Sequence, residues 1–382
     1  MSQLNYLEKL LDGVEVEWTT LGNEHAVEIA NSGRKPVKAA LRVAGETPYY
    51  GANNIQDYVD GYTHDGEFVL IAEDGSASLD NYSIQYATGR FWANNHVHVV
   101  RGKEGLNTRY LYHYLCIVNF VPFLSGGGRA KLTKGKLVDI PLPIPCPDNP
   151  EKSLAIQAEI VRILDAFTAM TAELTAELNM RKKQYNYYRE HLLSFDEGDV
   201  EWKTLGDIAE IGTGKHDTRD AIEDGEYIFY ARGREPLKLN TFNFDETAII
   251  TAGDGAGVGK VYHYAQGKYA LHQRAYRIVP DDSMHPRFVY HYISAYFNDY
   301  IQKASVSSSV TSLRRPMFLK FPIPVPPHSE QSRIVEILEK FETLTTSIQE
   351  GLPREIELRQ KQYEYYRDLL LSFPKSHSDE AA

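Results

Sequence analysis

The chain has 382 residues, a formal net charge of −11, two cysteines and 26 tyrosines. This length is enough for two or three domains with their own cores, and the acidic charge argues against a simple nucleic-acid-binding protein, whose domains are usually basic. Two cysteines cannot form a disulfide framework, and the apolar run at residues 110–124 is too short to cross a membrane, so we expect a cytoplasmic protein.

The chain opens with a short apolar segment and a tryptophan motif, VEWTTLG, which returns later as VEWKTLG. Three pairs of segments match in the same order: 16–22 with 200–206, 67–75 with 247–255, and 109–115 with 287–293. The second pair is typical of a buried strand that enters a tight turn, and the third pair predicts a helix. The whole chain is therefore an internal repeat, and this repeat fixes the architecture.

Each repeat then reaches a loop that carries basic residues and no acidic residue. The first such loop, at residues 125–136, is rich in glycine, and the second, at residues 304–320, is rich in serine. After each loop, proline stands at every second position, in residues 141–145 and 322–326. Because proline cannot donate a hydrogen bond within a sheet, we expect an extended edge strand that leads into a long helix.

Each repeat ends in a segment with the apolar period of a long helix, at residues 156–195 and 332–373. Apolar side chains at steps of three, four or seven predict one stripe, in the style of a coiled-coil seam. About 40 residues at about 1.5 Å each make a rod of about 60 Å, and the other copy can cover its stripe. Extra residues near Gly351 and Pro353 either form a stutter that keeps the stripe in phase, or proline kinks or breaks the helix. Ordinary core helices are the alternative.

These elements predict an α+β fold with two globular α/β domains, separated by two long antiparallel helices that form a coiled-coil spacer with a pseudo-twofold relation. The predicted boundaries are a first domain with a short N-terminal helix at 1–150, a central helical spacer at 151–195, a second domain at 196–330, a distal helical spacer at 331–375 and a disordered tail at 376–382. The helix ends agree more closely than the loops do. Two binding sites of one type but different specificity would require this pattern.

The helix ends carry the clearest family signature, RKKQYNYYREHLLSF at residues 181–195 and RQKQYEYYRDLLLSF at residues 359–373. Together with the repeated tryptophan motif and the proline-spaced strands, they resemble the specificity subunit of type I restriction-modification systems. The opening YLEKLLDGVEVEWTTLG is similar to the type IC family of these subunits. The resemblance covers essentially the whole chain.

The resemblance implies a non-catalytic subunit whose two target-recognition domains each read one half of a bipartite site in double-stranded DNA. It also implies that the helices set the half-site spacing and dock two modification (methyltransferase) subunits, and that a restriction-translocase subunit joins the complex. S-adenosylmethionine, ATP and Mg are then expected on those partners, with no cofactor in this chain. The tyrosine-rich helix ends are the candidate partner-binding surface, with Tyr185, Tyr188, Tyr363 and Tyr366.

The candidate DNA-binding residues are basic or carry an amide or imidazole, because Arg pairs with guanine, Asn and Gln pair with adenine, and Lys and Arg reach phosphates. In the first repeat they are Asn94, Asn95, His96, His98, Arg129, Lys131, Lys134 and Lys136. In the second repeat they are Arg232, Arg234, His272, Gln273, Arg274, Arg314, Arg315 and Lys320. Hydrogen bonding within a turn or core is the alternative for the Asn and His group, and a solvated surface is the alternative for the arginines.

Competing kinds of site lack an essential residue. The glycine-rich stretch at residues 253–260 has Asp254 where a nucleotide-binding P-loop needs glycine, and Val261 where it needs serine or threonine. His96 and His98 have no third metal ligand in pattern, and no Asn-Pro-Pro-aromatic or Asp-Pro-Pro-aromatic methylation motif occurs. We therefore expect no catalytic and no metal-binding residue. A coiled-coil scaffold that binds only proteins and a self-sufficient DNA-modifying enzyme remain as alternative functions.

Overall fold

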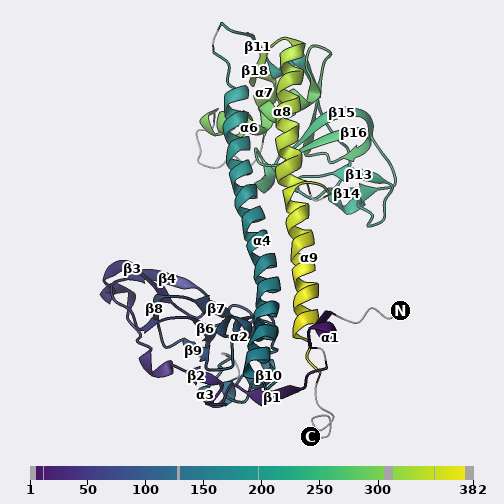
Figure 1. The fold of residues 1–382 in the computed structure, drawn as a ribbon. Coiled ribbons are helices and arrows are strands. Elements are labelled where there is room, and N and C mark those ends of the chain that lie inside the picture. The colour runs from purple at the N-terminus through teal and green to yellow at the C-terminus, as the bar shows by residue number, and fades with distance from the viewer. Residues whose placement is uncertain are drawn as a thin grey trace. The chain divides into compact units, whose positions relative to one another are not determined.

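The computed structural model describes residues 6–11, 13–126, 130–196, 198–304, 313–347 and 349–374. The chain forms two compact units (Figure 1). The first unit combines Met1–Leu174 with Ile356–Ala382, and the second unit is Thr175–Glu355. Each unit therefore contains one globular region and segments of two helical regions that are far apart in the sequence.

The first unit contains two four-stranded sheets, of order β2-β9-β6-β7 and β4-β3-β8-β5, and a two-stranded β1-β10 sheet. Its elements are α1 (Tyr6–Leu11), β1 (Val16–Thr20), β2 (Val27–Ile29), the 3-10 turns η1 (Asn31–Gly33) and η2 (Ala39–Leu41), β3 (Ala44–Tyr50), β4 (Ile55–Val59), β5 (His64–Asp65), β6 (Phe68–Ala72), β7 (Ile84–Ala87), β8 (Arg90–Ala93), β9 (Val97–Gly102), α2 (Thr108–Leu115), η3 (Val121–Phe123), α3 (Lys134–Leu137) and β10 (Pro141–Pro145).

The second unit contains one six-stranded sheet, of order β12-β17-β15-β16-β13-β14, and a two-stranded β11-β18 sheet. Its elements are β11 (Glu201–Thr204), α5 (Leu205–Ile208), β12 (Ala209–Thr213), η4 (Thr218–Asp220), β13 (Tyr227–Tyr230), β14 (Leu237–Leu239), β15 (Phe244–Ala252), η5 (Gly255–Gly257), β16 (Tyr262–Leu271), β17 (Ala275–Pro280), α6 (Pro286–Ala304), α7 (Arg315–Leu319), β18 (Pro322–Val325) and α8 (His328–Thr346). Both units mix helices and sheets, which confirms the predicted α+β class.

The proline-spaced segments form edge strands, as predicted. Within the described residues of the first unit β10 pairs with β1 alone, where Trp18 lies opposite Pro143. Likewise, β18 has β11 as its one described partner strand in the second unit, where Trp202 lies opposite Pro324. A two-stranded sheet tolerates these prolines, because each strand needs donors on one side only.

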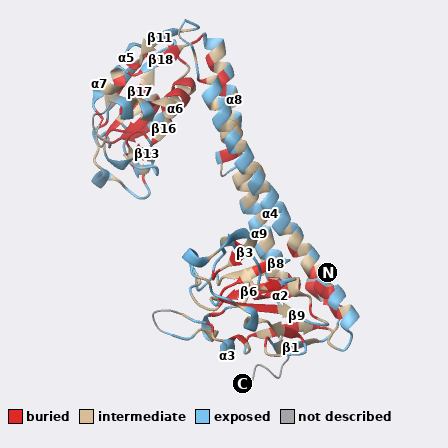
Figure 2. Ribbon diagram, turned by 90° about the vertical axis from the view of Figure 1, so that its left-hand side faces the viewer, coloured by how far each residue is buried: buried red, intermediate tan, exposed pale blue. Residues whose placement is uncertain are grey.

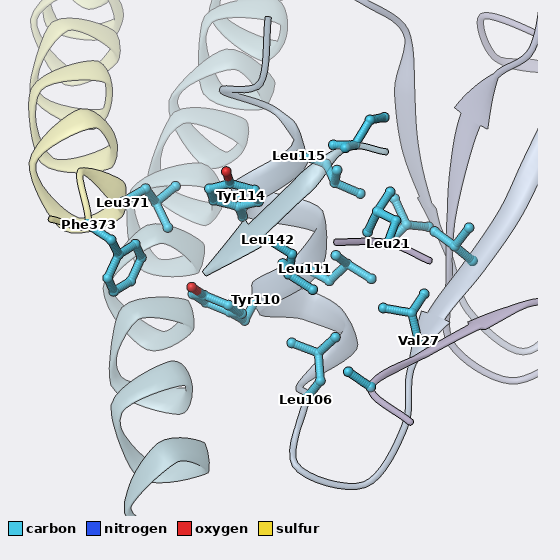
Figure 3. Close-up of a cluster of buried hydrophobic side chains, with 14 of the residues drawn as sticks. Leu21, Val27, Leu106, Tyr110, Leu111, Tyr114, Leu115, Leu142, Leu371 and Phe373 are labelled. Carbon is cyan, nitrogen blue, oxygen red and sulfur yellow. The ribbon is translucent and has the colours of Figure 1, made fainter. Parts of the chain in front are cut away.

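The end of the second helical region lies in the core of the first unit. Figure 3 shows Leu371 and Phe373 beside Tyr110 and Tyr114 of α2, and the ring centroids of Tyr110 and Phe373 lie 6.2 Å apart. Leu7 of α1 is buried in the same cluster. The core residues appear as buried segments of each globular region in Figure 2. Core packing therefore explains why the two helical regions end in nearly the same sequence.

The central helical region is one helix, α4 (Pro150–Leu192), as predicted. The distal region is two helices, α8 and α9 (Leu352–Leu371). Gly351 between them has a φ of +104°, and a Cβ at this position would lie 2.5 Å from the carbonyl oxygen of Thr343. The extra residues therefore break the helix and do not form a continuous stutter. Pro353 is the second residue of α9, where a missing N–H costs no helical hydrogen bond.

Candidate nucleic-acid interface

A tight turn between β8 and β9 of the first unit holds three of the candidate residues. The backbone N–H of Asn94 donates to the carbonyl of Tyr50 (3.2 Å), and the N–H of His96 donates to the Asn94 side-chain oxygen (2.8 Å). His96 also places Nδ1 2.6 Å from Oδ1 of Asp74, in the turn that follows β6. Asn94 is buried, and it therefore takes the turn-forming role that the sequence left open.

The second unit repeats this turn between β16 and β17 with different side chains. The N–H of His272 donates to the carbonyl of Tyr230 (3.0 Å), and the N–H of Arg274 donates to Nδ1 of His272 (2.9 Å). The guanidinium of Arg274 then donates to Oδ2 of Asp254 (3.0 Å), after β15. We call these two turns, residues 94–96 and 272–274, the paired turns. Their first residues are buried and their third residues bind an aspartate.

The middle residue of each turn is exposed, and the two differ in their bonding. Asn95 makes no side-chain hydrogen bond in the described part of the first unit, so its amide is available to a ligand. The amide nitrogen of Gln273 donates to Oδ2 of Asp217 (3.2 Å). Both amides have the donor and acceptor that bidentate recognition of adenine requires.

His98 is 1% exposed and has a structural role. Its Nδ1 accepts from the Asn31 amide (2.9 Å), and its Nε2 donates to the carbonyl of Leu132 (2.7 Å). Burial lowers the pKa of His98, which agrees with a neutral ring that has both nitrogens occupied. This side chain fixes the end of the glycine-rich loop and cannot reach a ligand.

The glycine-rich loop of the first unit is anchored at its base. Ser125 and Lys131 exchange backbone hydrogen bonds of 2.9 and 2.8 Å, and Lys131 places Nζ 3.0 Å from Glu73. Burial alone would raise the pKa of Glu73, but hydrogen bonds from Arg34 and Lys131 outweigh burial and hold the pKa below its usual value. Arg129 lies outside the described residues. Lys134 and Lys136 are exposed on α3.

The arginines of the second unit surround one carboxylate. Arg232 and Arg274 both contact Asp254, at 2.8 and 3.0 Å. Burial alone would raise the pKa of Asp254, but the hydrogen bonds from both arginines lower it. A cavity of about 480 Å³ beside them is lined by Arg232, Gly233, Arg234, Asp254, Gly255, Ala256, Gly257 and Val261. Within the glycine-rich stretch at residues 253–260, the short 3-10 turn η5 lines this cavity.

The serine-rich loop leads to further cations. Residues 305–312 lie outside the described residues, and Leu313 then donates its N–H to the carbonyl of Gly253 (2.7 Å). Leu132 donates in the same way to the carbonyl of Glu73 (2.7 Å) in the first unit. Both loops therefore return to the strand end that carries the aspartate. Arg314, Arg315 and Lys320 are exposed at α7.

Four basic residues of the first unit were missed by the sequence interpretation: Arg34, Lys35, Lys38 and Arg42. They lie in residues 29–45, which contain no acidic residue. A search for stretches that carry basic residues and no acidic residue, which found the glycine-rich and serine-rich loops, would also have found these four. The Arg34 guanidinium donates to the carbonyl of Val97 (2.8 Å), directly after the first paired turn.

The four candidate tyrosines pack within the helix pairs. In the first unit Tyr366 stacks on Phe167 at 5.3 Å, with Tyr363 half-buried nearby. In the second unit Tyr188 stacks on Phe341 at 5.4 Å and Tyr185 lies 6.4 Å from the same ring. The more exposed rings are their neighbours, Tyr187 at 65% and Tyr365 at 64%.

An exposed apolar residue precedes each of these rings by two helical turns. Met180 is 46% exposed before Tyr187, and Leu358 is 40% exposed before Tyr365. Residues seven apart lie on the same face of a helix. We call the faces Met180–Tyr187 and Leu358–Tyr365 the outer stripes, and each unit carries one.

Other kinds of site were sought in the described residues. No group of three or more His, Cys, Asp or Glu side chains in that part of the chain could hold a metal ion, and His96 and His98 have different hydrogen-bond partners. No helix among the same residues is long and apolar enough to span a bilayer.

Comparison with known proteins gives one family. The model of the type I restriction modification DNA specificity domain matches residues 15–181 and, a second time, residues 197–358. A putative type I restriction enzyme specificity subunit of Haemophilus influenzae is 47% identical, over 96% of this chain and 98% of its own length. The EcoR124I/EcoR124II specificity subunit of Escherichia coli is 40% identical, over 98% of each chain.

A solved structure supports the fold. The S subunit of a type I restriction-modification system from Mycoplasma genitalium aligns with a TM-score of 0.63 at 15% identity, and the alignment covers 96% of this chain and 98% of that one. At this identity the likeness concerns the fold alone.

Proposed function

The chain belongs to the family of type I restriction modification DNA specificity proteins, and from this premise we propose that each of its two units reads one half of a split DNA sequence. It is a specificity subunit, the non-catalytic component of a type I restriction-modification system. We further propose that the recognition domains are residues 1–150 and 196–330, with helical spacers at residues 151–195 and 331–375.

The observation that carries the proposal is the repetition of one turn with different exposed groups. Each paired turn has a buried first residue, an exposed amide in the middle and a third residue bound to an aspartate. The backbone is therefore held rigidly while the side chains differ. Two readers of one type with different specificities need this combination, since base identity is read by side chains.

We assign base reading to Asn95 in the first unit and to Gln273, Arg234 and Arg274 in the second. An exposed amide can form two hydrogen bonds with adenine, and a guanidinium can form two with guanine. Phosphate contacts are assigned to the exposed cations near the glycine-rich and serine-rich loops. These are Lys131, Lys134, Lys136, Arg314, Arg315 and Lys320, together with Arg129.

The subunit works in an assembly with DNA and other subunits, and we propose that two methyltransferase subunits bind the outer stripes. Two equivalent exposed faces suit two copies of one partner. A restriction-translocase subunit joins this complex, and S-adenosylmethionine, ATP and Mg bind to these partners. Of the four candidate tyrosines, Tyr185 and Tyr363 are half-buried, and the partly exposed Tyr188 and Tyr366 stack on Phe341 and Phe167 beside the stripes. The helices set the distance between the half-sites.

An exchange of domains tests this function. Residues 49–136 are replaced by the matching segment of a relative with a known target, and the complex is expressed with its methyltransferase subunit. The methylated sequence should change in one half only. A change in both halves would contradict independent reading, and loss of all DNA preference without loss of assembly would favour a scaffold that binds only proteins.

A further inference from the structure

Residues 34–43, which we call the basic loop, are fixed beside the first paired turn. The N–H of Lys35 donates to the carbonyl of Ala93 (2.9 Å), and the indole N–H of Trp92 donates to the carbonyl of Lys35 (2.6 Å). At the far end, the N–H of Asp60 donates to the carbonyl of Val43 (2.9 Å). The start of the loop is therefore bonded to the residue directly before Asn94, and backbone hydrogen bonds hold both ends of the loop.

Two of its four cations hold the loop in place. Arg34 pairs with Glu73 (2.5 Å), the carboxylate that also contacts Lys131 of the glycine-rich loop. Arg42 pairs with Asp57 (3.2 Å) and stacks over the ring of Tyr49 at 4.1 Å. Arg34 thus connects the base of the basic loop to the base of the glycine-rich loop.

Apart from the half-buried Val37, the other side chains of the loop are exposed. Lys35 and Lys38 form no ion pair in the described part of the chain. Leu41 and Val43 are 70% and 67% exposed, although they are large and apolar. A fixed loop that presents free cations beside exposed apolar groups has the character of a binding surface, and its charge selects a polyanion.

The second unit differs at the corresponding place. Its loop before β13 contains Asp217 and Asp220, and both carboxylates accept hydrogen bonds from backbone groups of the loop itself. The N–H of Asp217 donates to Asp220 (2.9 Å), and the N–H of Arg219 donates to Asp217 (3.2 Å). Asp217 also binds the amide of Gln273 (3.2 Å). That loop therefore positions the paired turn from within and lacks a net positive surface.

We propose that the basic loop is an additional DNA-contacting element of the first unit only, in which Lys35 and Lys38 bind phosphates while Leu41 and Val43 lie against base edges. The inference rests on the proposed function and adds an asymmetry to it. The first unit holds its half-site with more electrostatic contacts than its paired turn and glycine-rich loop supply. The apolar pair adds sequence preference, because a thymine methyl group is an apolar feature of the major groove.

The test uses the assembled complex and a duplex that carries its methylated sequence. Binding is measured over a range of salt concentrations for wild type, Lys35→Ala/Lys38→Ala and Leu41→Ser/Val43→Ser. Each phosphate contact contributes about 0.9 to the slope of log K against log salt, so the lysine variant should lose a slope of about 2. The apolar variant should keep the slope and lose about tenfold in preference for the specific duplex, within the usual range for a lost base contact.

Two further variants separate this effect from folding and from general loss of charge. Lys35→Arg/Lys38→Arg should restore the wild-type slope. Lys9→Ala/Lys103→Ala removes two exposed lysines of the same unit, Lys103 lying just after β9, whose other end joins the paired turn. This control should leave the slope unchanged.

Wild-type slope and affinity in Lys35→Ala/Lys38→Ala would overturn the inference and leave the proposed function intact, since wild type would still prefer its split site. Loss of the methyltransferase subunit from that variant, with unchanged DNA binding, would also overturn it in favour of a protein contact. A wild-type complex without preference for any split site would refute the proposed function itself.

Discussion

Asn95 and Gln273 occupy the same position in two copies of one hydrogen-bonded turn. Each lies between a buried residue that closes the turn and a residue that binds an aspartate. The first and third residues of the two turns make matching bonds, while the Asn95 amide has no partner among the described residues and the Gln273 amide is bound to Asp217. The chain thus keeps the geometry of the site constant and varies the groups that it presents.

Replacing Asn95 by alanine should relax recognition at one base of the first half-site. Loss of a bidentate contact should cost about 1–3 kcal/mol against the cognate duplex. Methylation mapping and binding to duplexes altered at single positions measure this effect. Asn186→Ala, which removes an exposed amide on α4, is the control. Uniformly weaker binding to all sequences would show that Asn95 contacts the backbone of the DNA and does not read a base.

Tyr187→Ala and Tyr365→Ala should each reduce co-purification with the methyltransferase subunit, because a large exposed ring at the centre of an interface contributes about 2 kcal/mol or more. The stability of the isolated chain should change by less than about 0.5 kcal/mol, as is usual for exposed sites. Tyr188→Ala should instead lower stability, since its ring stacks on Phe341. Tyr58→Ala removes another exposed ring and should leave co-purification unaffected. Full assembly of the double variant at Tyr187 and Tyr365 would exclude the outer stripes as docking faces.

His291 should make the second unit sensitive to acid. Burial lowers its pKa to about 3 from an unfolded value of 6.5, with nearby arginines as a further cause. The folded pKa is below the unfolded one, so the stability is complete above pH 6.5. It should fall by up to about 1.4 kcal/mol per pH unit as the pH decreases toward 3. Urea unfolding at pH 7 and pH 5 measures this loss.

His291→Phe should remove that part of the pH dependence because phenylalanine does not ionise, and it should lose no hydrogen bond at Nε2, which has no partner among the described residues. The corresponding residue of the first unit, His113, provides a contrast, since its Nε2 lies 2.8 Å from Asp165. His113→Phe should therefore lower stability by about 1 kcal/mol at pH 7. An unchanged pH dependence in His291→Phe would mean that other groups control acid unfolding.

A duplication of residues 175–178 should lengthen α4 by about one turn, or about 6 Å, and should widen the gap between the half-sites by one or two base pairs. The same insertion at residues 349–350 lies in the break between α8 and α9, where the chain can absorb it without a longer helix. Mapping the methylated motif of each variant measures the gap between its half-sites. An unchanged gap after the α4 insertion would show that this helix does not determine the spacing.

Features that depend on local sequence were predictable. The long α4 follows from the apolar periodicity of its own residues. The edge strands follow from the alternating prolines, which cannot donate a backbone hydrogen bond. The break after α8 was only one of two alternatives, since it depends on the conformation of Gly351 against the carbonyl of Thr343.

The site was predictable as a set of segments but not residue by residue. Asn94 and His98 have the chemistry of DNA-reading residues, yet the Asn94 side chain accepts from the N–H of His96 within its own turn. The His98 ring bonds to Asn31 and Leu132, which are distant in sequence. The exposure of a helical tyrosine likewise depends on the helix that packs beside it. Tyr187 and Tyr188 are adjacent in the sequence, but only Tyr188 stacks on Phe341.

The central claim is that one chain reads two half-sites with two copies of one scaffold. The most direct measurement is to co-express this chain with its methyltransferase subunit and to map methylated adenines on genomic DNA. The account predicts a split motif with two defined halves around a gap of fixed length, one half altered by Asn95→Ala and the other by Gln273→Ala. A continuous motif, or methylation that neither substitution changes, would contradict it.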